Sequence, residues 1–141
     1  MKVNFETKFF QKKIFRENII ERYFNNALKD FRIASKNQDP DVIFKFTYDA
    51  LIKTGISLIA FRGYRTKSRL GHHIKILEKL SQILSDENIQ IIGNAMRKKR
   101  NLDLYEGGMI ISRKEAKDCF EIVEGIIKKA KNYLKSQNSL F

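Results

Sequence analysis

The sequence predicts an all-α fold, an up-and-down helical bundle of four main helices plus an accessory helix, forming a single domain over residues 1–141. Apolar residues recur at three- and four-residue steps along most of the chain, and strict alternation is absent. The 141 residues, 43% of them hydrophobic, suffice for one compact core but not for two ordinary domains. The helical segments are joined by short connections, which favours antiparallel neighbours.

The first helix is expected over residues 7–36. Its apolar stripe is clearest between residues 20 and 34, where Ile, Tyr, Phe, Ala and Leu follow helical spacing. Phe15, Ile19 and Ile33 lie off this stripe. They either widen the contact with the core or meet a second subunit.

The second helix is expected to start after Asp39, a plausible N-cap, with Pro40 in the first helical position, and to reach about residue 62. It is apolar nearly all round, which is typical of the most buried helix of a bundle. Its polar side chains are spaced four residues apart: Lys45, Asp49 and Lys53. This spacing allows Asp49 to face both lysines.

The segment that follows carries four cations and no acid: Arg62, Arg65, Lys67 and Arg69. A third helix is expected from about residue 68 or 71 to 85. His73 lies on its apolar stripe, and His72 is turned about 100° away.

The fourth helix is expected over residues 87–105, ending at the Gly107-Gly108 pair. Its predicted core residues are Ile91, Ile92, Ala95, Met96 and Leu102. A polar face lies beside this core and comprises Asn94, Arg97, Asn101 and Tyr105, while Arg100 borders the core one turn after Met96. The fifth helix opens with a capping box, in which Ser112 caps the N-terminus and Glu115 returns the bond.

The polar face suits a phosphodiester. Arg provides planar, permanently charged donors, Asn provides a donor and an acceptor, and Tyr can stack on a base or donate its hydroxyl. The alternative is that the cations, Lys98 among them, complement the helix macrodipole and stay solvated.

The histidines and the cysteine do not indicate a cofactor or a metal site. His73 is typical of a hydrogen-bonded core residue, whereas His72 is the freer candidate for titration near neutral pH. The two rings are expected to point in different directions, so they make a poor metal pair. Cys119 is the only cysteine, which excludes an internal disulfide, and its place on the apolar stripe of the fifth helix predicts an inert thiol.

The charge balance favours anionic partners. Lys and Arg number 28 against 16 acidic residues, a formal net charge of +12, and the resulting positive potential attracts phosphate-bearing molecules unless it only solvates the surface. The chain lacks the roughly 18 consecutive apolar residues that span a bilayer, and its N-terminus lacks the apolar stretch of a signal peptide. A cytoplasmic protein that does not bind membranes is expected.

Two segments carry a family resemblance. They are FTYDALIKTGISLIAFRGYRTKSRLGHH (residues 46–73) and MRKKRNLDLYEGG (residues 96–108), followed by the capped last helix. Together they resemble the HEPN superfamily of small helical-bundle proteins, over most of the chain. The resemblance implies four main helices plus an accessory one, a homodimer, and a polar cleft at the subunit boundary.

The family also implies functions. Many members are metal-independent RNA endonucleases of toxin–antitoxin or abortive-infection systems, often encoded beside a small nucleotidyltransferase, and others resemble noncatalytic RNA or nucleotide binders. Active members use an Arg, the polar residue after it, and a His four to six residues beyond the Arg. Arg100 and Asn101 match the first two, but Tyr105 stands in the place of the His. Tyrosine, with a pKa of about 10, is a poor base at pH 7, so His72 or His73 would have to supply the base.

The leading interpretation is therefore an RNA- or nucleotide-binding protein, with metal-independent ribonuclease activity as an open question. The candidate catalytic residues are Arg100, Asn101, Tyr105 and His72, and the candidate phosphate-binding residues are Arg97, Lys98, Arg65, Arg69 and His73. One alternative is a noncatalytic module that pairs with a nucleotidyltransferase or another partner through Phe15, Ile19 and Ile33. Another is a helical bundle with structural histidines and a solvated cationic surface.

Overall fold

The computed structural model describes residues 2–105 and 111–137, with residues 103–105 as backbone only. Within these ranges the chain forms five helices: α1 (Glu17–Ser35), α2 (Pro40–Phe61), α3 (His72–Ile83), α4 (Glu87–Tyr105) and α5 (Arg113–Gln137). Two short strands, β1 (Phe10–Lys12) and β2 (Tyr64–Thr66), pair antiparallel. The predicted helical class is confirmed in this form.

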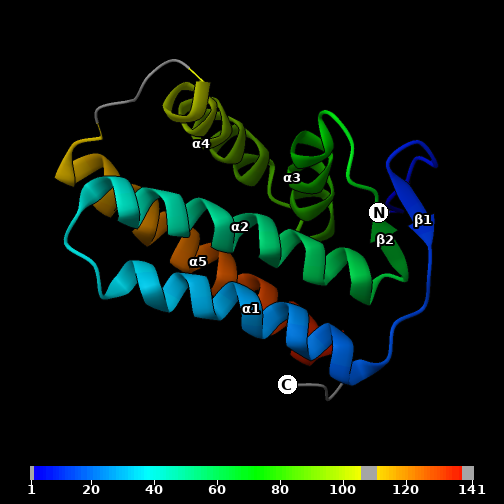
Figure 1. The fold of residues 1–141 in the computed structure, drawn as a ribbon. Coiled ribbons are helices and arrows are strands. Elements are labelled where there is room, and N and C mark those ends of the chain that lie inside the picture. The colour runs from blue at the N-terminus through cyan, green and yellow to red at the C-terminus, as the bar shows by residue number, and fades with distance from the viewer. Residues whose placement is uncertain (1, 106–110, 138–141) are drawn as a thin grey trace.

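Helix α2 is the centre of the core, as its apolar composition predicts. Most of its residues are buried, and it packs against α1, α3 and α5. Figure 1 shows α1, α2 and α5 lying alongside one another, while α3 and α4 form a second hairpin inclined to them. The up-and-down order of four main helices is therefore not confirmed.

The prediction of helix over residues 7–16 is wrong, because this stretch includes strand β1 and packs on segments far away in sequence. Phe10 is buried in the core, and Phe5 stacks on Tyr64 with ring centroids 4.1 Å apart. Ile14, which helical spacing would place one turn after Phe10, is 85% exposed. The apolar spacing here imitates a helix, but the partners that bury it come more than 50 residues later.

Both predicted N-caps form, but the capping box at Ser112 makes only one of its two predicted bonds. The Asp39 carboxylate accepts a hydrogen bond from the backbone N–H of Asp41 at 2.9 Å. The Ser112 hydroxyl accepts one from the N–H of Glu115 at 3.0 Å. The return bond of the capping box is a wrong prediction, because the Glu115 carboxylate pairs with Lys99 of α4 instead.

The core face of α4 is predicted only in part. Met96 is buried and Ile92 packs against the core as predicted, but Ile91 and Leu102 are 65% and 48% exposed, and Ile89 and Gly93 are buried instead. A Cβ on Gly93 would lie 2.5 Å from a terminal methyl of Leu77, so this glycine permits α3 and α4 to approach closely. A glycine carries no hydrophobic signal, which explains why the spacing of apolar residues missed Gly93.

Candidate phosphate-binding pocket

A pocket of about 430 Å³ lies between the start of α3 and the C-terminal half of α4. We call it the histidine pocket, and its lining residues are Arg69, Leu70, Gly71, His72, His73, Ile74, Arg97 and Asn101. Gly71 adopts the left-handed conformation (φ 80°) immediately before α3, which a side chain would strain. This turn places both histidines in the first turn of α3, opposite the polar face of α4.

His73 is held from behind by a buried tyrosine. The hydroxyl of Tyr48 lies 2.9 Å from Nδ1 of His73, and Tyr48 is 1% exposed. Burial is the main cause that lowers the pKa of His73, and together with electrostatic repulsion from His72, Arg97 and Arg100 it brings the value to about 4. His73 is therefore neutral at pH 7, and it is hydrogen-bonded as the sequence predicted.

Burial also raises the pKa of Tyr48, which keeps its hydroxyl protonated at neutral pH. A protonated Tyr48 can donate to Nδ1 of His73, and in that arrangement the ring proton of His73 is on Nε2. His73 then offers an N–H donor to the pocket.

His72 has a different arrangement. Its Nδ1 lies 2.6 Å from the backbone carbonyl of Arg69, and because a carbonyl only accepts, Nδ1 must carry the proton. In the neutral ring, Nε2 is then an unprotonated acceptor. The expectation that the two rings diverge is wrong, because the rings of His72 and His73 are in edge contact with centroids 4.5 Å apart.

The polar face of α4 supplies the opposite wall. Arg97 is half-buried, and its Nε donates to the side-chain oxygen of Asn94 at 3.3 Å. Asn101 is exposed and lines the pocket one turn beyond Arg97. The structure thus brings Arg97 and Asn101, two residues of the predicted polar face, to one pocket with both predicted histidines, which come from a separate segment.

Arg100 is not part of this lining. It is half-buried and lies close enough to α2 to lower the pKa of Asp49, which burial raises. Lys45 and Lys53 also lower the pKa of Asp49, as the predicted spacing allows, but Lys53 forms its ion pair with Asp30 of α1, at 2.6 Å. Arg100 therefore provides positive charge behind the pocket, near His73 and Tyr48.

The remaining predicted site residues lie elsewhere. Lys98 is exposed and outside the histidine pocket, and Arg65 lines a neighbouring pocket that also includes His72. Tyr105 is the last residue of α4, and its side chain lies outside the described residues, as do the predicted stop at Gly107-Gly108 and its neighbours.

Sequence reasoning missed three residues of the site. One is Tyr48, which lies in the nearly all-apolar second helix; a buried tyrosine needs a hydrogen-bond partner, which is a usable signal. Leu70 and Ile74 form an apolar rim, and they are 100% and 36% exposed. Nothing in the local sequence distinguishes these two from ordinary loop and helix residues.

No family model, curated protein or solved structure matches this chain. Along the described ranges, no helix is both long and apolar enough to cross a membrane. In the same part of the chain, no three His, Cys, Asp or Glu side chains are grouped so as to hold a metal ion. Cys119 is half-buried, and burial raises the pKa of its thiol, which makes the thiolate scarce at neutral pH.

Proposed function

We propose that the protein binds RNA or a nucleotide through phosphate contacts in the histidine pocket, as the resemblance to the HEPN superfamily implies. The observation that carries the proposal is the convergence of Arg97, Asn101, His72 and His73 on one pocket of about 430 Å³. A guanidinium, an amide and an imidazole N–H are donors that suit phosphate oxygens. The net charge of +12 favours the approach of a polyanion.

The same groups support a further proposal, metal-independent RNA cleavage. In this reaction the 2′-hydroxyl attacks the adjacent phosphorus, so a base removes its proton, an acid protonates the leaving 5′-oxygen, and cations stabilise the phosphorane. Nε2 of His72 is the proposed base, because its Nδ1 proton is committed to a carbonyl. Arg97 and Arg100 supply positive charge. Tyr105, which stands in the place of the family's His, is the proposed acid because a phenol carries a proton at pH 7.

Binding is tested by fluorescence anisotropy with a labelled single-stranded RNA at several salt concentrations. Arg97→Met is expected to weaken binding and to reduce the salt dependence by about one phosphate contact, whatever the RNA sequence. The matched control is Arg32→Met, which removes an exposed arginine of α1, a helix that contributes no residue to the pocket. An equal loss of RNA affinity in the two variants would show that only the net charge matters, and it would contradict a phosphate site.

Cleavage is tested with the same RNA in EDTA. Loss of the base in His72→Asn and loss of positive charge in Arg100→Ala are each expected to slow cleavage, the former by about 100-fold or more. Activity that is equal in the wild type and both variants would indicate a contaminant. No activity in any of them would leave a binding protein only.

We also propose that a second copy of the chain covers the apolar rim of the pocket, as the homodimer implied by the resemblance requires. Leu70, Ile74 and Leu102 are exposed, and the first two line the pocket. Phe15, for which either a core contact or a second subunit was expected, packs edge-on against Tyr23. Burial of an apolar rim favours association, and a partner such as a small nucleotidyltransferase could use the same surface.

Sedimentation velocity tests this proposal. Leu70→Glu is expected to shift a dimer to monomers, because association would bury the new charge. Ile122→Glu is the control, since Ile122 is 39% exposed on α5, a helix that contributes no residue to the pocket. A monomeric wild type, or a dimer that tolerates Leu70→Glu, would contradict the proposal.

A further inference from the structure

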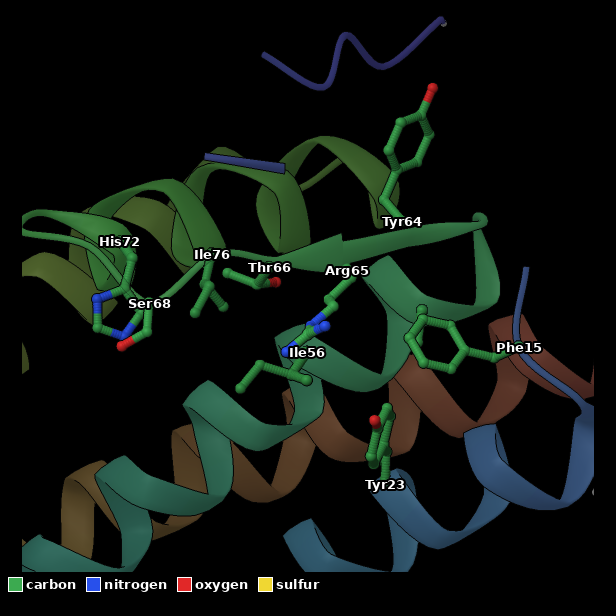
Figure 2. Close-up of a pocket in the computed structure, with 10 residues that line it drawn as sticks. Phe15, Tyr23, Ile56, Tyr64, Arg65, Thr66, Ser68, His72 and Ile76 are labelled. Carbon is green, nitrogen blue, oxygen red and sulfur yellow. The ribbon is translucent and has the colours of Figure 1, made fainter. Parts of the chain in front are cut away.

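A second pocket lies beside the histidine pocket. It has a volume of about 230 Å³ and is formed by α1, α2, the segment around β2, and the start of α3. Figure 2 shows Ile56 and Ile76 facing it, with Tyr23 reaching up from α1 and Phe15 at one side. We call it the aromatic pocket.

The N-terminal segment fixes the direction of Arg65 in this pocket. Strand β1 pairs with β2, and successive side chains of a strand point to opposite faces. Tyr64 points away from the pocket and stacks on Phe5, so Arg65 points inward, toward Ile56 (Figure 2). Within the described residues, the guanidinium of Arg65 makes no hydrogen bond and no ion pair.

One further polar group is available to a ligand. The hydroxyl of Ser68 lies beside His72 in Figure 2. Apolar walls, aromatic rings and unpaired polar groups together suit a flat heterocycle with a polar edge, and a guanidinium suits an adjoining phosphate.

His72 lines both pockets. A strand with one phosphate in the histidine pocket would therefore bring its neighbouring nucleotide to the aromatic pocket. We propose that the aromatic pocket is a base subsite, which receives an unstacked base of single-stranded RNA next to the bound phosphate. This inference rests on the proposed function, and it narrows the substrate to unpaired RNA of at least two nucleotides.

A tryptophan reporter tests the subsite, because the chain contains no tryptophan. In Tyr23→Trp, stacking of a base is expected to quench the fluorescence when single-stranded RNA binds. Ile122→Trp is the control, since it places the same fluorophore at an exposed position of α5 that belongs to neither pocket. RNA with an abasic nucleotide next to the bound phosphate should bind without quenching the tryptophan at position 23.

Affinity provides the second readout. Tyr23→Leu is expected to weaken binding of the intact RNA by about tenfold and to have little effect on the abasic RNA. Arg65→Gln removes a donor for the adjoining phosphate, so it is expected to weaken binding of both RNAs. If RNA binds and depends on Arg97, but the tryptophan at position 23 is not quenched and these variants bind normally, the base subsite is wrong and the phosphate site stands. If the wild type binds no RNA, both proposals fail.

Discussion

The pairing of Tyr48 with His73 illustrates how single residues set the properties of the site. Tyr48 is buried in α2, and its hydroxyl reaches His73 from below the pocket. Because the imidazole is half-buried among cations, its charged form is disfavoured. His73 is therefore a neutral hydrogen-bonding group at pH 7, which separates its role from that of His72.

This low pKa predicts a pH dependence of stability. The folded-state pKa of His73 is about 4, below the usual 6.5, so between these values the unfolded chain binds the proton more readily. The contribution of His73 to the free energy of unfolding is thus complete above pH 6.5 and is lost as the pH falls toward 4, by about 1–3 kcal/mol in total. Urea unfolding at several pH values measures this. As the pH falls from 6.5 toward 4, the free energy of unfolding should decline less steeply for His73→Asn than for the wild type. Identical slopes for the wild type and the variant would contradict the low pKa.

The site was predictable where its chemistry is local. Arg97 and Asn101 lie on one helical face because of their spacing, and this face does line the pocket. The contact of His72 with Arg69 and that of His73 with Tyr48 depend on a glycine turn and on a partner 25 residues away. The periodicity of side chains predicts neither the turn nor the distant partner.

At the scale of elements, α2 and α3 pack unusually closely at Gly55. A Cβ at this position would lie 2.5 Å from Cγ2 of Ile76, a fully buried branched residue that cannot swing aside. Gly55→Ala is therefore expected to destabilise the fold by about 1–3 kcal/mol, despite the better helix propensity of alanine.

Gly125 of α5 is the matched control. A Cβ there meets nothing within 4 Å, so Gly125→Ala should stabilise the protein by about 0.5–1 kcal/mol. Urea unfolding of both variants measures the difference. Equal effects of the two substitutions would contradict the close packing of α2 on α3.

The N-terminal segment is attached to α3 by a charge cluster. Lys79 is 2% exposed and its Nζ lies 2.7 Å from Glu6, whose other oxygen is 2.5 Å from Lys75. Glu78 accepts from both lysines. These pairs lower the pKa of Glu6 to about 2, although burial alone would raise it.

Glu6→Gln is consequently expected to reduce the free energy of unfolding by about 1–3 kcal/mol at pH 7, because Lys79 remains buried with one partner fewer. The folded pKa of Glu6 is depressed, so its contribution is present above the usual value of 4.5 and is lost as the pH falls toward 2. The stabilities of wild type and Glu6→Gln should therefore converge in acid. A constant difference between pH 7 and pH 2 would contradict the cluster.

Helices and strands were predictable from the sequence where the local pattern of residues determines them without a distant partner. Helix α2 is apolar all round and α4 spans residues 87–105, both as the spacing predicts. Strand β1 is three residues long and exists because β2 pairs with it. Such a strand is decided by a distant partner, which a local pattern cannot reveal.

At the scale of the whole molecule, the net charge of +12 and the histidine pocket make separable contributions to stability. Like charges repel in the compact state, so any added salt is expected to raise the melting temperature by screening. Phosphate should add to this at equal ionic strength, because an anion that binds only the folded state stabilises it by mass action.

Thermal unfolding separates charge screening from phosphate binding. The melting temperatures of the wild type and Arg97→Met are measured in sodium chloride and in sodium phosphate, at equal ionic strength and pH. The chloride effect should be nearly the same in both proteins, since one charge in twelve is a small change in the overall repulsion. The additional effect of phosphate should shrink in Arg97→Met, because that side chain lines the pocket and the loss is local. If phosphate stabilises both proteins equally beyond chloride, its effect is general exclusion from the protein surface, and the pocket does not hold the anion.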